Sequence, residues 1–491
     1  MASDAQPLPQ PADASARGGE QPEGSAAGAS TLGAAFNMLC VVIGTGMLQL
    51  PYGLRQSGWL GLPLLLLMSA MACYTAVVLG SSLGLARQCL VLRIQDYPPI
   101  ERTTVSSPAS SEASTITVGG ALAAGTPLLV QSPVRNRNRS EAAPVTAAQH
   151  SVDAAAAQIR SYGDIGHEAF GWFGRWFVVV QMHLTLLLVG TIYHLLTSIN
   201  LVDLLSTNES NWLGETRSVL LVGGLLWFHV FLKTLSEVAV ISYFNMMISV
   251  ALLVVVISQA VTHPPTAPVS HTFLTAEIRS FGSAFASFGF AYGVHPMIPS
   301  IIESMRSPSQ FTYMACASFA GVLCFYVPIV VVGYSIYGDD VASPIYETEP
   351  LKGAAAVKII IGCLSAHLLM AYPIVFNPPE RALETSLGID QYRRPLFWRI
   401  VLRSAFVLFS TGVALLVRSP KRFGPFLDLV SACTSTFTVF ILPSVFYMKL
   451  QGIQRLHRAE LAWNVLIIFV SLFGAVFGSI DAIEALIKSY R

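Results

Sequence analysis

Residues 37–51 read NMLCVVIGTGMLQLP, an apolar run with Gly44, Thr45 and Gly46 at its centre. Glycine weakens a helix by about 1 kcal/mol relative to alanine. No charged side chain occurs in 31–54, which is long enough to cross a bilayer. Hydrocarbon cannot satisfy the backbone groups that a break frees, so a break is tolerated only where it lines a cavity within the protein. The stretch therefore predicts a membrane-spanning helix that is interrupted near its middle.

The rest of the chain also has the composition of a membrane protein. It is 53% hydrophobic and only 12% charged, whereas soluble domains are about one quarter charged. The net charge is +1 and no basic stripe indicates nucleic-acid binding. Apolar segments of about 20 residues predict an all-α membrane protein with about eleven spans. The spans are expected at 31–54, 59–83, 176–201, 213–232, 238–261, 280–302, 311–337, 354–378, 395–417, 425–447 and 461–480.

The fourth and ninth of these spans are short between their flanking charges, and the alternative is that one of them is re-entrant. When the loops are assigned alternately to the two sides, about two thirds of the Lys and Arg residues lie on the side of the N-terminus. This excess predicts a cytoplasmic N-terminus. Asn208, in an Asn-Glu-Ser sequon of a predicted outer loop, is the expected glycosylation site.

The chain is expected to divide into two disordered and two membrane-embedded regions. A disordered cytoplasmic tail occupies 1–30, and the first two spans occupy 31–86. A disordered cytoplasmic loop, rich in Ser, Thr, Ala and Pro, occupies 87–160, and the remaining spans lie in 161–491.

Residues 281–300, FGSAFASFGFAYGVHPMIPS, hold a second cluster of helix breakers, in the sixth predicted span. Spans one and six are equivalent members of two five-helix halves. Broken helices at equivalent positions of an inverted repeat indicate a transporter site. Half-helix N-termini attract a carboxylate and freed carbonyl groups attract an ammonium group, so an amino acid fits the pair. The alternative is close packing, because small residues are common where membrane helices touch.

The candidate substrate-binding residues lie at or beside the two breaks: Asn37, Gly44, Thr45, Gly46, Gly289, Phe290 and Tyr292. The backbone of residues 44–46 is expected to bind the substrate carboxylate. Asn37 lies two helical turns earlier on the same face, where it either binds substrate or braces the broken helix. Phe290 and Tyr292 either close over the substrate side chain or pack in the core. Ser242 and Asn245 in the fifth span are further candidates for the polar floor of the site.

His295, beside the second break, is the candidate for ion coupling. An ordinary histidine titrates between the pH of an acidic compartment and that of the cytosol. The alternative is a neutral histidine that hydrogen-bonds to freed carbonyl groups. At the end of the same span, Glu303 is expected to pair with Arg306. No metal site or other cofactor is expected, and the energy source is a proton or sodium gradient.

Several ordered motifs resemble the amino acid/auxin permease family. They are 43–59 (IGTGMLQLPYGLRQSGW), 288–305, 333–338 (GYSIYG), 372–373 with 379–381, and 442–447 (LPSVFY). Residues 161–171 (SYGDIGHEAFG) resemble the vacuolar and vesicular branch of that family. The resemblance covers about residues 30–488 apart from the long loop, and it is specific to a family but not to a substrate.

The resemblance implies a leucine-transporter-type fold with a 5+5 inverted repeat and broken helices 1 and 6. It also implies secondary active transport of amino acids by alternating access, often with protons, in a vacuolar, lysosomal or vesicular membrane. A sodium-coupled carrier and an amino acid sensor remain alternatives. No obligate protein partner is indicated beyond the lipid bilayer and a small-molecule substrate. No Walker-type loop or other catalytic motif indicates an enzyme.

Overall fold

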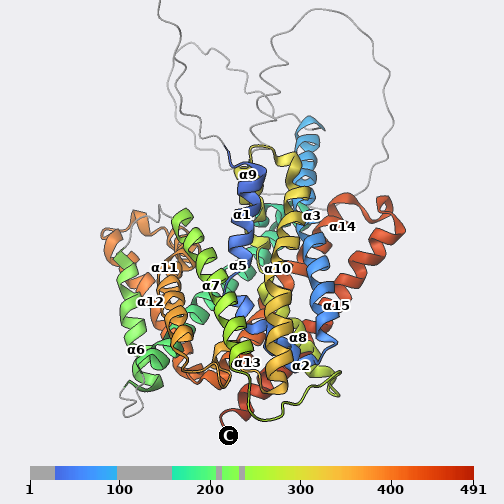
Figure 1. Cartoon of the computed structure of the whole chain (residues 1–491). Coiled ribbons are helices and arrows are strands. Elements are labelled where there is room, and N and C mark those ends of the chain that lie inside the picture. The colour runs from blue at the N-terminus through green and yellow to red at the C-terminus, as the bar shows by residue number, and fades with distance from the viewer. Residues whose placement is uncertain (1–27, 97–157, 206–212, 232–237) are drawn as a thin grey trace, which may run out of the picture.

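The computed structural model describes residues 28–96, 158–205, 213–231 and 238–491, and this part of the chain is a bundle of helices. Its only β-pairing among these residues is an isolated parallel bridge between Ala29 and Met305. In Figure 1 the N-terminal end of α1 lies at the top, and α2, α13 and the C-terminus lie at the bottom.

The α-helices are α1 (Thr31–Val42), α2 (Leu50–Ser57), α3 (Gly61–Asp96), α5 (Tyr162–Leu205), α6 (Gly214–Trp227), α7 (Val238–Thr262), α8 (Ile278–Ala291), α9 (Ile298–Ser304), α10 (Phe311–Tyr337), α11 (Ala355–Ser386), α12 (Pro395–Val417), α13 (Pro420–Val430), α14 (Leu442–Gln451) and α15 (Arg458–Lys488). Two π-helical turns, Ser431–Ser435 and Phe437–Ile441, join α13 to α14 in one long segment.

Eight helices of the described chain are long and apolar enough to cross a membrane. The pair α1 and α2, bent by 45°, adds a ninth if it is one broken span. The fourth predicted span corresponds to α6, which has only 14 residues, and the sixth is divided between α8 and α9. The all-α, multi-span prediction is confirmed, whereas the number eleven stays a prediction.

Both predicted breaks are present, as a leucine-transporter-type fold requires. The first span stops at Val42 and resumes as a 3₁₀ turn, Thr45–Gln49, that leads into α2. The sixth stops at Ala291 and resumes through the turn His295–Met297 into α9. Prolines lie in the first positions of these resumed segments, where a missing N–H group costs no helical hydrogen bond.

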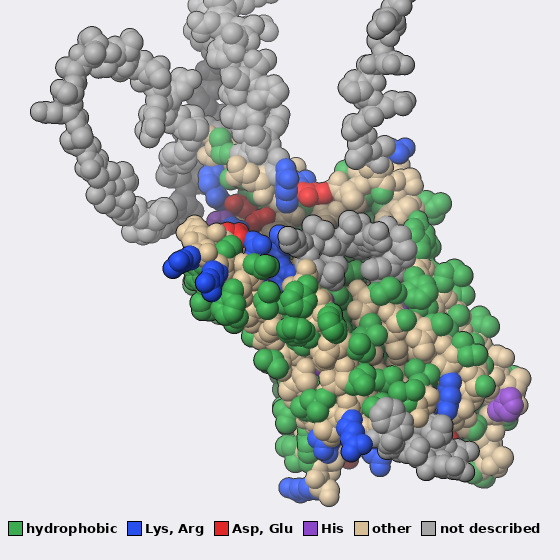
Figure 2. All heavy atoms as spheres, turned by 90° about the vertical axis from the view of Figure 1, so that its left-hand side faces the viewer, with side chains coloured by type: hydrophobic (Ala, Val, Ile, Leu, Met, Phe, Trp, Pro, Cys, Tyr) green, Lys and Arg blue, Asp and Glu red, His purple; other side chains and the backbone are tan. Residues whose placement is uncertain are grey.

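The outer surface fits a lipid environment. Figure 2 shows apolar side chains gathered across the middle of one face, with Lys and Arg side chains mainly towards its two ends. Exposed Leu220 and Leu225 on α6 and Leu408 and Leu416 on α12 are examples of large apolar side chains that water would not favour.

The segment beside the long loop differs from the expected boundaries. Helix α3 continues past residue 86 to Asp96, and its Arg87 pairs with Glu303 at 3.1 Å. The expected Glu303–Arg306 pair is therefore replaced, because the Arg306 side chain instead donates to the carbonyl oxygen of Gly28 at 3.2 Å. The rest of the predicted loop (97–157), most of the tail (1–27) and the sequon residue Asn208 lie outside the described residues.

Candidate functional site

The two broken spans meet at their breaks. A Cβ atom on Gly46 would lie 2.7 Å from the Cα atom of Ala291 at the end of α8, which is too close for any side chain. Gly46 therefore allows direct backbone contact between the two breaks. This agrees with the alternative explanation of the small residues, that they allow membrane helices to pack closely.

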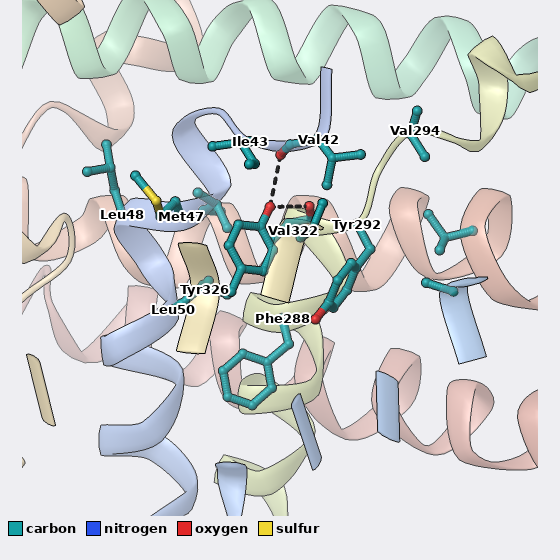
Figure 3. Close-up of a cluster of buried hydrophobic side chains, with 14 of the residues drawn as sticks. Val42, Ile43, Met47, Leu48, Leu50, Phe288, Tyr292, Val294, Val322 and Tyr326 are labelled. Carbon is teal, nitrogen blue, oxygen red and sulfur yellow. Dashed lines mark hydrogen bonds between the residues drawn. The ribbon is translucent and has the colours of Figure 1, made fainter. Parts of the chain in front are cut away.

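Tyr326 on α10 joins the same two breaks through one hydroxyl group. Its oxygen lies 2.9 Å from the carbonyl oxygen of Val42 and 2.7 Å from that of Ala291 (Figure 3). A phenol has a single hydrogen, so the two carbonyl groups share it. The side chain is fully buried, and its ring lies 5.6 Å from that of Tyr292. Tyr326 thus satisfies the carbonyl groups left open where α1 and α8 end.

Helix α7 satisfies two further carbonyl groups at the end of α1. The Asn245 amide donates to the carbonyl oxygens of Cys40 and Ile43 at 2.9 and 3.1 Å. The Ser249 hydroxyl lies 3.3 Å from the Ile43 oxygen and 2.8 Å from its own helix at Asn245. Asn245 therefore lies at the break and braces the backbone there, while its part in a polar floor of the substrate site stays a prediction.

The N–H groups on the other side of the first break remain open. Those of Gly44, Thr45 and Gly46 donate to no residue in the described part of the chain, while the Met47 N–H group bonds back to the Gly44 oxygen at 3.1 Å. A Cβ atom on Gly44 would meet nothing within 4 Å, so open space adjoins this residue. The free amides form the N-terminal, electropositive end of the segment that continues into α2.

The other predicted substrate residues have varied surroundings. Asn37 is exposed, and Thr45 is buried but its hydroxyl bonds to no described residue. Phe290 is half-buried beside Gly289. Tyr292 is fully buried, and its hydroxyl donates to the Leu65 oxygen of α3 at 3.3 Å. The packing of Tyr292 agrees with the core alternative, and the substrate role of all these residues stays a prediction.

His295 lies in the protein interior between α9 and α3. Its Nε2 atom lies 3.0 Å from the Thr75 hydroxyl, which itself donates to its own helix. The Nε2–H group is therefore the donor in this pair. The Nδ1 atom has no partner among the described residues. No carboxylate of the described residues forms an ion pair with His295.

The motif resemblance is matched by a comparison of the whole chain with known families. The model of the family described as transmembrane amino acid transporter protein matches residues 27–97 and 146–484. The chain belongs to this family. Its members are transporters rather than enzymes, as the absence of catalytic motifs predicted.

The chain is similar to several curated transporters of Arabidopsis thaliana, of which two are described. Amino acid transporter AVT1I is 23% identical over 467 residues, covering 92% of this chain and 94% of the relative. Amino acid transporter AVT1B is 22% identical over 465 residues, covering 93% and 71%. A solved structure of Mhp1, a nucleobase-cation-symport-1 family transporter with bromovinylhydantoin bound, aligns over 94% of this chain at 13% identity with a TM-score of 0.45.

The transporter also contains a buried polar cluster that the sequence prediction missed. Asp428 on α13 is fully buried and contacts Gln49 and Gln56 of the first span and Ser287 of α8. A signal was available, because Asp428 is the one acidic residue in the predicted span 425–447. Ionisable residues inside a membrane span are expensive and commonly functional.

A cavity of about 580 Å³ lies next to this cluster, at the end of the bundle that carries α2 and α13. Tyr52, Arg55, Ser343 and Gly424 are among its lining residues. Glu347 also lines the cavity. Burial, and after it the neighbouring Asp203, raise the pKa of the Glu347 carboxyl to about 8, whereas Lys352 acts to lower it. Glu215, Lys352 and Lys421 also line the cavity, so charged side chains of both signs face it.

Proposed function

We propose that this transporter moves amino acids across an acidic endomembrane by secondary active transport driven by a proton gradient. The observation that carries the proposal is the set of free N–H groups at residues 44–46 beside open space, in the middle of a membrane-spanning segment. Such groups are costly in a membrane unless a ligand or water completes their hydrogen bonds.

The substrate carboxylate binds these amides, because they lie at the positive end of the segment leading into α2. The neighbouring carbonyl groups of Val42, Ile43 and Ala291 already accept hydrogen bonds from protein side chains. Each carbonyl oxygen has a second lone pair, so an ammonium group binds there only as an additional donor. Recognition is therefore dominated by the carboxylate.

The ties between the two breaks support a mechanism of alternating access. Tyr326 and the Gly46–Ala291 contact join the broken spans, so the two spans move together against the helices around them. A proton drives this motion only if it binds one of the two states more tightly. His295 is one candidate for the proton's site. The vacuolar and vesicular resemblance of residues 161–171 supports an acidic endomembrane.

The test is uptake of a ¹⁴C-labelled amino acid mixture by proteoliposomes that contain the purified full chain. We expect accumulation when the exterior is acidic and loss of accumulation when a protonophore collapses the gradient. Uptake that ignores the pH gradient would overturn proton coupling. If such uptake also ceases when choline replaces sodium, the protein is a sodium-coupled carrier. Saturable binding without flux would instead identify a sensor.

A further inference from the structure

We infer that Asp428 binds the coupling proton of this transport cycle and that its protonation opens the gate next to the 580 Å³ cavity. The inference rests on the proposed proton-driven function and assigns the proton to Asp428 rather than to His295. It is carried by the position of a buried carboxylate between three membrane segments and a cavity.

The Asp428 carboxylate connects α13 to both broken spans. Its Oδ2 atom accepts from the Gln56 amide at 2.7 Å. Its Oδ1 atom accepts from the Gln49 amide at 3.2 Å and from the Ser287 hydroxyl. Hydrogen bonds to an ionised carboxylate are about twice as strong as neutral ones. The ionised form of Asp428 therefore holds α2 and α8 against α13.

The hydrogen bonds of Ser287 allow a second arrangement. The hydroxyl has one hydrogen and two acceptors within reach, the Asp428 carboxylate and the Gln56 side-chain oxygen at 3.1 Å. It also accepts from the Gln49 amide at 3.3 Å. When Asp428 is protonated, the carboxyl can donate to Ser287, and the Ser287 hydrogen turns to Gln56. The cluster therefore satisfies its polar atoms in either protonation state.

The charges around Asp428 favour proton uptake. The carboxylate has no Lys, Arg or His partner within the described ranges, and the titratable groups that act on it are Tyr52 of α2 and Asp481 of α15. Asp481 accepts from Ser283, one turn before Ser287 on α8, at 2.7 Å. Arg55 of α2 instead donates to the Val341 oxygen at 2.8 Å. A fully buried carboxylate without a cationic partner is costly while it is charged, and the charge of Asp481 adds to that cost.

Lys421 of α13 itself lines the cavity, and several other cations near α13 have partners of their own. They are Arg279 and Lys488 with Glu484, Lys352 with Glu347 and Asp203, Arg418 with Glu215, Arg403 with Glu384, and Arg422 with Ser489. His194 of α5 bonds to Ser410 and to the Val219 oxygen.

A short route joins the cluster to the cavity. Gln49 donates to the Gly424 oxygen at 3.4 Å, and its side-chain oxygen accepts from Ser343. Both Gly424 and Ser343 line the cavity. Only the Gln49 side chain therefore separates Asp428 from the cavity. Protonation replaces charge-assisted hydrogen bonds with neutral ones, which weakens the contact of α2 and α8 with α13 and opens the cavity towards the breaks.

The test compares two kinds of transport in proteoliposomes with the ¹⁴C-labelled amino acid mixture. Exchange of internal for external substrate needs no net proton movement, whereas accumulation against a gradient does. In Asp428→Asn we expect accumulation driven by the pH gradient to fall about tenfold or more while exchange stays within about twofold of the wild type. His295→Gln should retain driven accumulation.

Asp481→Asn is the matched control, because it removes the neighbouring carboxylate of α15, which accepts a hydrogen bond from Ser283 of α8. It should retain driven accumulation, with the pH profile moved to lower pH because a repelling charge is lost. Driven accumulation at the wild-type level in Asp428→Asn would overturn the inference. If accumulation is lost in His295→Gln but kept in Asp428→Asn, the coupling proton binds at His295 and not at Asp428.

If Asp428→Asn loses exchange as well as driven accumulation, Ser287→Ala provides the test of the inference. It keeps the carboxyl but removes a hydrogen-bond donor to its ionised form, so the pH profile of driven accumulation should move to higher pH. An unchanged profile would overturn the inference. If wild-type uptake ignores the pH gradient altogether, the proposed function fails instead, and the two failures are thereby distinguished.

Discussion

Gly44 and Gly46 stand two residues apart and have opposite surroundings. Gly46 touches the backbone of Ala291, where no side chain fits, whereas Gly44 adjoins open space. The backbone of Gly44 has φ −145° and ψ −143°, so its φ lies outside the left-handed region that favours glycine. The first glycine therefore provides room for a ligand, and the second provides contact between the broken spans.

Gly44→Ala and Gly46→Ala should accordingly fail in different ways. The Gly44→Ala methyl group fits the protein but occupies the space beside the free amides, so KM should rise about tenfold with little change in folded yield. Gly46→Ala forces the breaks apart and should lower the thermal stability and the yield of monodisperse protein. Uptake kinetics and size-exclusion profiles measure both effects. Equal KM values for Gly44→Ala and the wild type would show that residue 44 does not adjoin the bound substrate.

The residues of the first break were predictable because their helix-breaking chemistry is local. Their separate tasks were not, because these depend on what α8 brings opposite each glycine. Tyr326 was missed for the same reason, since a tyrosine in an apolar span looks like an ordinary core residue. Asp428 could have been noticed as an acid in a span, but its partners Gln49 and Ser287 lie far away in the sequence.

At the scale of elements, the interrupted spans depend on α10 to hold them together. Tyr326→Phe would leave the carbonyl groups of Val42 and Ala291 without their donor, at a cost of about 1–3 kcal/mol for each buried group left unsatisfied. Tyr337→Phe on the same helix is the matched control. The Tyr337 hydroxyl is also buried but has no partner in the described structure.

We therefore expect Tyr326→Phe to lower the melting temperature in detergent and to slow uptake, while Tyr337→Phe leaves both near the wild-type values. Equal melting temperatures for the two variants would contradict the role given to Tyr326.

The existence of the helices was predictable from apolar length, but their ends were not. Helix α3 reaches Asp96 because Arg87 and Arg93 find partners in Glu303 and Glu168, which are remote in sequence. Helix α6 is short, as the bracketing charges of the fourth predicted span indicated. Residue spacing thus predicts where a helix crosses the membrane, whereas tertiary ion pairs decide how far it continues beyond it.

At the scale of the whole molecule, stability should depend on pH through Glu347, which lies outside the spans. Its carboxyl pKa is raised from 4.5 to about 8, chiefly by burial. The native state therefore holds this proton more tightly than the unfolded chain does. The resulting stability is fully present below about pH 4.5 and is lost as the pH rises towards 8.

Glu347→Gln cannot titrate, so its melting temperature should fall less than that of the wild type between acidic and mildly alkaline buffer. Glu349→Gln, in the same loop but exposed, is the control and should retain the wild-type difference. A wild-type melting temperature that rises towards pH 8, with Glu347→Gln behaving alike, would contradict this contribution.

The long loop should be dispensable for transport. The family match stops at residue 97 and resumes at 146, so the intervening segment lies outside what the family shares. The two flanks are held close together, because Arg93 pairs with Glu168 at 2.9 Å and Arg87 donates to the Ile159 oxygen at 2.9 Å. A short Gly-Ser linker in place of 98–145 can therefore join them without moving α3 or α5.

Proteoliposomes with this variant should retain driven uptake within about twofold of the wild type, since the broken spans and their partners are unchanged. Loss of uptake in a variant that still elutes as monodisperse protein would show that the loop takes part in transport.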